Sequence, residues 1–191
     1  MQLLIMKKIL LIVGHPNWKD SVANRAIIDE FMRLNPDAET SNITELYPHG
    51  DIDVVAEQKK LLEADTIILQ FPVMWYSCPS VMHKWMEAVL TYGFAYGQGG
   101  DKLKGKRLFA SFTTGGTADM YSRYGAQKMT IDDLMPPFAG IPYHCHMTWG
   151  GYVFSGGMMV AGNTNKEQLA AFRVRAKAHA ARLDSLIKSY T

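Results

Sequence analysis

The sequence predicts an α/β fold in which a doubly wound, five-stranded parallel sheet carries helices on both faces. Short apolar runs alternate along the chain with segments of helical periodicity, and this alternation is typical of a parallel sheet. The runs at 9–13 and 66–71 are the strongest, as in strands that are buried on both faces. A length of 191 residues, without an internal repeat or a linker, indicates one domain over 1–191.

The strands are identified from these apolar runs. In chain order they are expected over 8–13, 40–46, 66–71, 107–113 and 147–154. The first contains ILLIV and the third is TIILQF, whereas the second is a weaker candidate. Lys7 and Lys8 before the first run resemble the start of a signal peptide, but the GHP that follows offers no small-residue cleavage site. We therefore expect a first strand and a cytoplasmic protein.

The helices between the strands are identified from apolar residues at helical spacing. Ser21 can cap the first helix, and Asn35-Pro36 ends it. Residues 57–63 form a helical segment, and Asn165 with Gln168 makes a capping box for the closing helix. The buried stripes are expected at Ala23, Ala26, Ile27, Phe31 and Leu34 in the first helix, at Met82, Trp85, Met86, Val89 and Leu90 after the third strand, and at Leu169, Phe172, Ala176, Leu183 and Leu186 in the closing helix.

Composition and charge argue against several classes of protein. Hydrophobic residues make up 48% and charged residues 20%, which is ordinary for a globular chain. The net charge is +2 and no basic cluster is found, so no nucleic-acid partner is expected. Two cysteines cannot form a disulfide framework, and no segment reaches the roughly 18 apolar residues of a membrane span. His144-Cys145-His146 supplies too few ligands for a zinc site, so no metal is expected.

Ligands of such sheets bind beyond the carboxyl ends of the strands, which singles out three loops. The first, GHPNWKDSVAN at 14–24, joins a buried strand to a helix. The amides of residues 22–24 have no helical acceptor at this first turn, and the Ser21 hydroxyl adds a donor, so the loop suits a phosphate. An ordinary capped helix is the alternative. The loop lacks the glycine pattern of dinucleotide-binding folds and the Gly-Lys-Ser/Thr of P-loops.

The other two loops offer a flat wall and a set of donors. FPVMWYSCPS, at the end of the third strand, presents Trp75 and Tyr76 as a wall for a planar ring, with a core cluster as the alternative. TTGGTADMYSRYG, at the end of the fourth, brings glycine amides that can bind a developing negative charge. Tyr121 or Tyr124 would add a donor, and a mobile turn is the alternative. Together the three loops offer what a flavin nucleotide needs.

With these motifs the chain resembles the NAD(P)H:quinone oxidoreductase family, whose fold is flavodoxin-like. The motifs that carry the resemblance are GHP at 14–16, SVAN at 21–24, LYP with DIDVVAEQ at 46–58, QFPVMWYSCPSVMHKW at 70–85, GFAYGQGG at 93–100 and TTGG at 113–116. They span most of the chain in the family's order. The chain looks closest to the short FMN-containing branch, which includes the ancillary flavoproteins of glutathione-gated potassium efflux systems.

The resemblance implies a role for each loop. Around the phosphate and ribityl chain it places His15, Ser21, Val22, Ala23 and Asn24. Bordering the flavin ring it places Val73, Met74, Trp75 and Tyr76, and along the pyrimidine edge Thr113, Thr114, Gly115 and Gly116. The implied catalytic residues are Tyr121, Gly115 and Gly116, and the implied substrate pocket consists of Tyr96, Trp75 and Tyr76. Gln127 stands where the family has a histidine, which argues against the proton-relay form of the mechanism.

The implied reaction is a ping-pong transfer. NAD(P)H gives a hydride to the flavin and leaves, and a small quinone-like acceptor then takes the same place. FMN is favoured over FAD, because FAD-binding members carry a C-terminal extension and this chain stops soon after its last expected helix. The resemblance also implies a homodimer, in which the partner subunit often supplies the residue at the position of Tyr96.

Two further functions stay open. The similarity of LYPHGDIDVVAEQ to the potassium-efflux branch suggests a regulatory flavoprotein subunit that docks on a membrane transporter. A one-electron carrier of the flavodoxin type is less well supported, because such carriers are usually strongly acidic and this chain has a net charge of +2. The main prediction is therefore an enzyme, with the regulatory subunit as its alternative.

Overall fold

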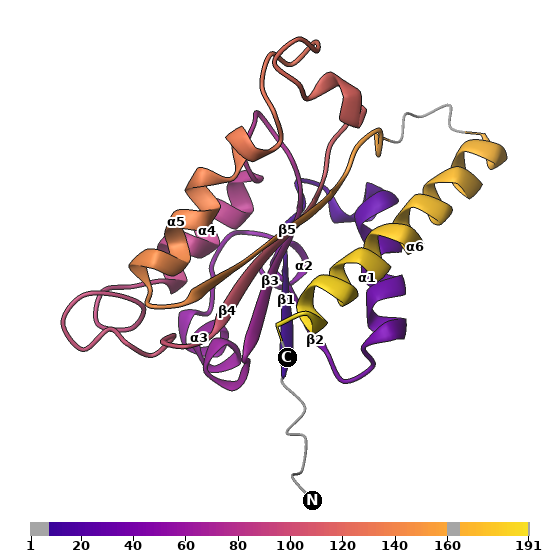
Figure 1. Cartoon of the computed structure of the whole chain (residues 1–191). Coiled ribbons are helices and arrows are strands. Elements are labelled where there is room, and N and C mark those ends of the chain that lie inside the picture. The colour runs from indigo at the N-terminus through magenta and orange to yellow at the C-terminus, as the bar shows by residue number, and fades with distance from the viewer. Residues whose placement is uncertain (1–7, 160–164, 191) are drawn as a thin grey trace, which may run out of the picture.

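The computed structural model describes residues 8–159 and 165–190. Within them a five-stranded, all-parallel sheet forms in the order β2-β1-β3-β4-β5 (Figure 1). Its strands are β1 (Ile9–Val13), β2 (Glu39–Asn42), β3 (Thr66–Pro72), β4 (Arg107–Thr113) and β5 (Thr148–Ser155). The predicted parallel sheet is confirmed, and each predicted strand overlaps an observed one.

Helices connect these strands. They are α1 (Ala23–Leu34), α2 (Ile43–Leu46), α3 (Val54–Glu63), α4 (Ser80–Val89), α5 (Pro136–His144) and α6 (Lys166–Lys188). Short 3-10 helices in the loops are η1 (Trp18–Asp20), η2 (Ala118–Met120) and η3 (Asp132–Leu134). The predicted capping box between Asn165 and Gln168 opens α6. In the described part of the chain, no helix has the length and apolar character to cross a membrane.

Two local predictions are wrong, and the helix α5 was not predicted. Residues 43–46, expected to continue the second strand, form α2, because the Asn42 side chain accepts a hydrogen bond from the Glu45 amide and caps a helix there. Ser21 does not cap α1. Val22 takes the capping position with helical backbone angles, and no side chain bonds to this end of the helix. The Ser21 hydroxyl is therefore left for another partner.

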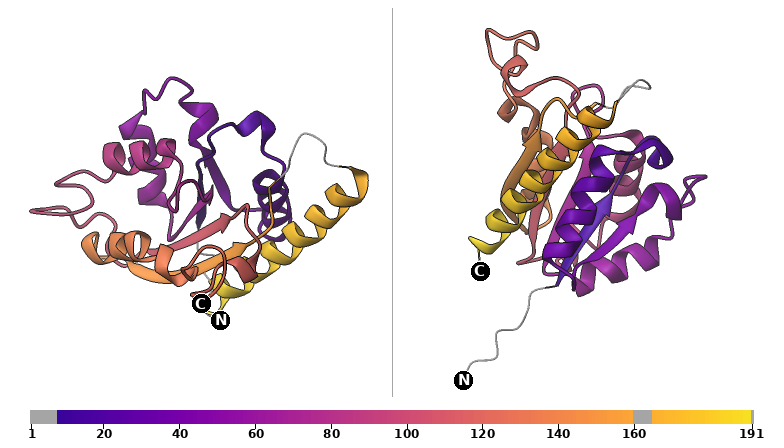
Figure 2. Two further views of the ribbon diagram at one scale, coloured as in Figure 1. Left: turned by 90° about the horizontal axis from the view of Figure 1, so that it is seen from above. Right: turned by 90° about the vertical axis from the view of Figure 1, so that its right-hand side faces the viewer.

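Alternate residues of each strand point to opposite faces of the sheet, and their side chains form part of two hydrophobic layers, one on each face. The layer under α3, α4 and α5 is built around Leu10, Ile12, Ile67, Leu69, Trp85, Phe112 and Phe138. The layer under α1 and α6 is built around Leu11, Val13, Phe31, Ile68, Phe109 and Leu183. The helices α1 and α6 lie side by side across their face (Figure 2). Because the strands are parallel, the loops that follow them meet at one edge of the sheet.

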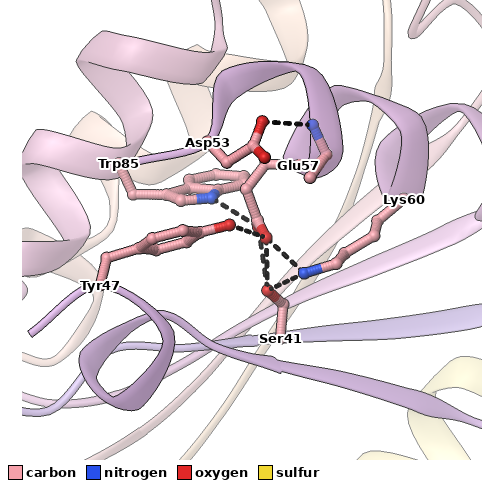
Figure 3. Close-up of polar contacts among 7 residues, drawn as sticks. Ser41, Tyr47, Asp53, Glu57, Lys60 and Trp85 are labelled. Carbon is pink, nitrogen blue, oxygen red and sulfur yellow. Dashed lines mark hydrogen bonds and ion pairs between the residues drawn. The ribbon is translucent and has the colours of Figure 1, made fainter. Parts of the chain in front are cut away.

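A buried carboxylate, Glu57, stands in the layer under α3 and α4 (Figure 3). It accepts hydrogen bonds from the Ser41 hydroxyl at 2.8 and 2.9 Å and from the Trp85 indole at 2.8 Å. The Tyr47 hydroxyl donates to it at 3.0 Å, and the Lys60 ammonium pairs with it. Burial and the neighbouring charge of Glu57 raise the pKa of Tyr47 to about 12. These five residues, the Glu57 cluster, join β2, α3 and α4.

Candidate functional site

A cleft of about 360 Å³ lies at the carboxyl ends of β1, β3 and β4. It is lined by His15, Pro16, Asp20, Ser21, Val22, Ala23, Asn24, Pro72, Val73, Met74, Thr113, Thr114, Gly115, Met158 and Met159. The strand order reverses between β1 and β3, and ligands of open parallel sheets bind at this switch point. The volume falls in the range of roughly 300–1,000 Å³ that is usual for small-molecule sites.

The end of the cleft at α1 is suited to an anion. The first helical bond here runs from the Ala26 amide to the Val22 carbonyl, so the preceding amides have no helical acceptor. Ser21 is only 5% exposed, and its hydroxyl has no hydrogen-bond partner. Among the described residues it is the one buried side-chain polar atom in this condition. An unpaired buried hydroxyl is costly, and a ligand oxygen would satisfy it.

His15 contributes a neutral ring to the same end. The Thr44 hydroxyl accepts from the His15 amide at 3.0 Å and donates to its carbonyl at 2.8 Å, which fixes the loop against α2. The ring Nδ1 accepts from the Asn17 amide at 3.1 Å. Burial lowers the pKa of His15, so the ring is uncharged at neutral pH. Its proton is then on Nε2, which makes His15 a hydrogen-bond donor without a positive charge.

The aromatic loop after β3 makes a tight and strained turn. Met74 and Ser77 exchange two backbone hydrogen bonds, of 2.8 and 3.0 Å, and enclose Trp75 and Tyr76. Both enclosed residues have positive φ, 48° and 65°, a pattern in which asparagine and glycine are normally found. Bulky side chains in this conformation carry strain that is typical of functional loops. Trp75 is 90% exposed and Tyr76 is 50% exposed, so these two residues are not part of the core cluster that was the alternative, although Cys78 of the same loop is.

The glycine loop after β4 is held by close packing rather than by positive φ. The Thr114 hydroxyl and the Gly157 amide both donate to the Gly116 carbonyl at 2.8 Å. A Cβ on Gly115 would lie 2.7 Å from the Met159 Cε, and one on Gly116 would lie 3.3 Å from the Tyr121 ring. The exposed Met159 side chain can move away from a Cβ on Gly115, whereas one on Gly116 would press on the Tyr121 ring.

Gln127 links the aromatic and glycine loops. Its side-chain oxygen accepts a hydrogen bond from the Tyr76 hydroxyl at 3.2 Å, and its backbone amide donates to the Met120 carbonyl at 3.0 Å. Tyr121 is partly buried beside Gly116, whereas Tyr124 is almost fully exposed. The residue that replaces the histidine implied by the resemblance is thus a structural bridge.

The cleft brings most predicted site residues together. Those that line it are His15, Ser21, Val22, Ala23, Asn24, Val73, Met74, Thr113, Thr114 and Gly115. Those that do not line it are Trp75, Tyr76, Gly116, Tyr121 and Tyr96. Gly116 and Tyr121 adjoin the lining residue Gly115, but Tyr96 packs elsewhere, with its ring 4.6 Å from that of His144.

Five lining residues were not predicted. Pro16, Asp20 and Pro72 belong to the loops already identified, whereas Met158 and Met159 follow β5. The signal for the methionines was available, because the loop after every parallel strand reaches this edge. Asp20 is the one carboxylate among the described residues that line the cleft, and the Asn17 side-chain amide donates to it. In the parts of the chain described here, no three histidine, cysteine or acidic residues gather to hold a metal.

Comparison with known proteins gives relatives of similar length. A family model described as flavodoxin-like fold matches residues 7–180. General stress protein 14 of Bacillus subtilis is 39% identical over 131 residues, or 69% of this chain and 74% of that protein. The uncharacterized NAD(P)H oxidoreductase YrkL of Bacillus subtilis is also 39% identical, over 69% of this chain and 75% of its own. The potassium-efflux ancillary protein KefG of Cronobacter sakazakii is 37% identical, over 74% of this chain and 77% of that protein.

Solved structures share the fold over nearly the whole chain. General stress protein 14 from Treponema denticola, in complex with FMN, has a TM-score of 0.82 and 27% identity, over 94% of this chain and 99% of that one. An NADPH-quinone reductase from P. pentosaceus has a TM-score of 0.69 and 26% identity, over 90% and 98%. A chain described as a thermophilic tryptophan halogenase has a TM-score of 0.77 and 32% identity, over 90% and 96%.

Proposed function

This chain belongs to the flavodoxin-like family, and on that premise we propose that it is an FMN-dependent NAD(P)H oxidoreductase that passes hydride to a quinone-like acceptor. The observation that carries the proposal is the unpaired, buried hydroxyl of Ser21 beside the first turn of α1. An anionic ligand would satisfy this hydroxyl and the free amides together. The FMN complex of the Treponema denticola relative supports the choice of cofactor.

The residues present fit FMN. Ser21 and the amides of residues 22–24 would hold its phosphate, with neutral His15 as a further donor. The ring would be bordered by Val73, Met74, Trp75 and Tyr76, and its pyrimidine edge by Thr113, Thr114, Gly115 and Gly116. The redox chemistry, acceptance of a hydride from NAD(P)H and its donation to the acceptor in a ping-pong cycle, is supplied by FMN when it is bound.

The protein's part in the reaction is to position groups and to stabilise charge. The amides of Gly115 and Gly116 and the Tyr121 hydroxyl would donate hydrogen bonds where negative charge develops. An amide does not titrate in the working pH range, so Gln127 holds the loops together without relaying a proton. Charge stabilisation in this chain is therefore expected to rest on fixed donors.

An anaerobic titration with NADPH tests the proposal. We expect flavin absorption bands in the purified protein, which bleach at about one equivalent of NADPH per subunit. Parallel lines in double-reciprocal plots with a quinone acceptor would support the ping-pong order. A protein that neither contains nor binds FMN would contradict the proposal.

The exposed position of Trp75 and the remoteness of Tyr96 fit a site completed by a second copy. A homodimer is therefore part of the proposal, with Trp75 and Tyr76 of one subunit and Tyr96 of the other bordering the acceptor. Light scattering after gel filtration should give twice the mass of the chain. A monomer that keeps full activity would contradict this part.

A second candidate is a regulatory flavoprotein on a potassium-efflux transporter. The 37% identity to KefG of Cronobacter sakazakii favours it. The protein would then lie in the cytoplasm and dock on the membrane protein. A pull-down with membranes that contain the transporter tests this, and no retention under gentle conditions would exclude the regulatory role.

A further inference from the structure

A chain of buried polar side chains runs from α6 across the sheet. His179 on α6 is fully buried. Its ring Nδ1 lies 2.9 Å from the Ser155 hydroxyl at the end of β5, and its Nε2 lies 2.8 Å from the Ser111 hydroxyl on β4. On the outer side, the exposed Arg182 reaches back and donates to the Ser155 hydroxyl at 3.0 Å.

The chain continues from Ser111 to the cleft. The Ser111 hydroxyl donates to the side-chain oxygen of Gln70 at 2.6 Å. The Gln70 amide nitrogen donates to the side-chain oxygen of Asn24 at 2.7 Å, and the Asn24 nitrogen donates to the Thr113 hydroxyl oxygen at 3.0 Å. Asn24 and Thr113 both line the cleft. We call these residues, from Arg182 to Thr113, the His179 chain.

The hydrogen bonds of the His179 chain all point the same way. A guanidinium can only donate, so Ser155 accepts from Arg182 and gives its own proton to Nδ1 of His179. Burial, with the nearby charge of Arg182, lowers the pKa of His179 to about 3, so the ring is neutral. A neutral ring that accepts at Nδ1 carries its proton on Nε2, and it donates this proton to Ser111.

The opposite direction is less favourable. If Nδ1 carried the proton, Ser155 would accept from both His179 and Arg182. Its hydroxyl proton would then have no acceptor among the described residues, which is costly for a buried group. Arg182, at the outer end of the His179 chain, therefore determines the direction in which its hydrogen bonds run.

We propose that His179 is a positioning residue that fixes Thr113 as a hydrogen-bond donor toward the cleft. It acts through Ser111, Gln70 and Asn24, each of which accepts on one side and donates on the other. Because the Thr113 oxygen already accepts from Asn24, its own proton is free for a ligand acceptor such as a carbonyl oxygen or a ring nitrogen. The identity of that ligand as a flavin rests on the proposed function.

The direction of the chain can be measured without any ligand. A long-range ¹H–¹⁵N correlation spectrum of the histidine rings at neutral pH reports which nitrogen of His179 is protonated. The signal of His179 is assigned by its disappearance in His179→Gln. We expect a proton on Nε2 and none on Nδ1. A proton on Nδ1 would overturn the proposal, whether or not the protein binds FMN.

The effect on the cleft is tested with two matched serines. Ser111 and Ser41 are both fully buried on strands, and both bond to several polar partners, but only Ser111 leads to the cleft. We expect Ser111→Ala to raise the FMN dissociation constant about tenfold and Ser41→Ala to change it less than about twofold. Equal effects of the two substitutions would overturn the proposal.

A double-mutant cycle shows whether Ser111 acts through Thr113. In a Thr113→Val background, Ser111→Ala should weaken FMN binding no further, because the donor it orients is already gone. His179→Gln, which can both accept and donate, should bind FMN more tightly than His179→Leu. Additive losses in the cycle would overturn the proposal. Absence of FMN binding by the wild-type protein would instead remove the proposed function and leave the ring tautomer to decide the direction.

Discussion

The Glu57 cluster and the His179 chain are both buried polar groups, yet they are built differently. The cluster is closed: one carboxylate accepts from several donors, Lys60 also donates to Ser41, and no member of the cluster lines the cleft. The chain is open: it starts at the exposed Arg182 and ends at Thr113 in the cleft. A closed cluster can only hold elements together, whereas an open chain transmits a hydrogen-bond direction to a ligand site. The two should therefore respond differently to mutation.

The largest effect is expected from Glu57→Ala. The substitution removes the common acceptor of the cluster and leaves its buried donors unpaired, so it should lower the free energy of unfolding by about 3–5 kcal/mol. Urea denaturation followed by circular dichroism measures the loss. Glu63→Ala, at an exposed glutamate 3.8 Å from Lys8, should cost less than about 0.5 kcal/mol. FMN affinity of the folded protein should not change, and a loss of affinity with little loss of stability would break the comparison.

The next effect is a pH dependence that comes from His179. The unfolded chain binds a proton there near the ordinary pKa of about 6.5, and the folded chain only near about 3. Unfolding therefore takes up a proton in this window. Stability is fully present above about pH 6.5 and falls as the pH drops toward 3. The loss at pH 5 should be about 2 kcal/mol.

His179→Gln isolates this contribution. Burial also lowers the pKa of His15, so this residue too makes the protein less stable as the pH falls. Its contribution is the same in the wild type and in His179→Gln. The difference in unfolding free energy between pH 7 and pH 5 should therefore be smaller in His179→Gln than in the wild type. Equal differences in the two proteins would show that His179 is not held neutral.

A smaller effect is expected from Trp85→Phe. The substitution removes one donor to Glu57 and keeps most of the packing, while Ser41, Tyr47 and Lys60 still bond to the carboxylate. The expected cost is about 1 kcal/mol, measured by the same urea denaturation. A loss as large as that of Glu57→Ala would mean that the cluster depends on the indole bond alone rather than on a shared acceptor.

The sheet and the cleft loops were predictable because their signals are local. ILLIV and TIILQF are apolar runs typical of buried strands. Because the strands are parallel, the loops that follow them lie at the same edge of the sheet. The error at 43–46 arose because an apolar residue such as Ile43 can be buried equally well in a strand or in a helix. The helix forms here because the Asn42 side chain caps its first turn. The helix α5 was missed because Pro136, Pro137 and Pro142 suggest a loop, although proline is favoured at a helix start.

The His179 chain was only half predictable. The apolar stripe of α6 includes Ala176 and Leu183, and this spacing places His179 on the buried face. Gln70 and Ser111 are polar residues within apolar strand runs, which marks them as unusual. Their pairing depends on the register of β3 with β4, which no local pattern gives. The role of Tyr96 stays a prediction, because it depends on a second copy of the chain.

Ser21 gives the smallest expected change in stability and extends the comparison to a buried polar group with no partner. Its hydroxyl is unpaired in the structure, so Ser21→Ala should leave the unfolding free energy of the FMN-free protein unchanged or raise it by up to about 1 kcal/mol. The same substitution should weaken FMN binding about tenfold, because a donor to the phosphate is lost. Ser80→Ala, at an exposed serine in the first turn of α4, should change neither. Urea denaturation and calorimetric titration with FMN measure the two quantities. A clear loss of stability without FMN would show that Ser21 already has a partner, and unchanged FMN affinity would remove it from the site.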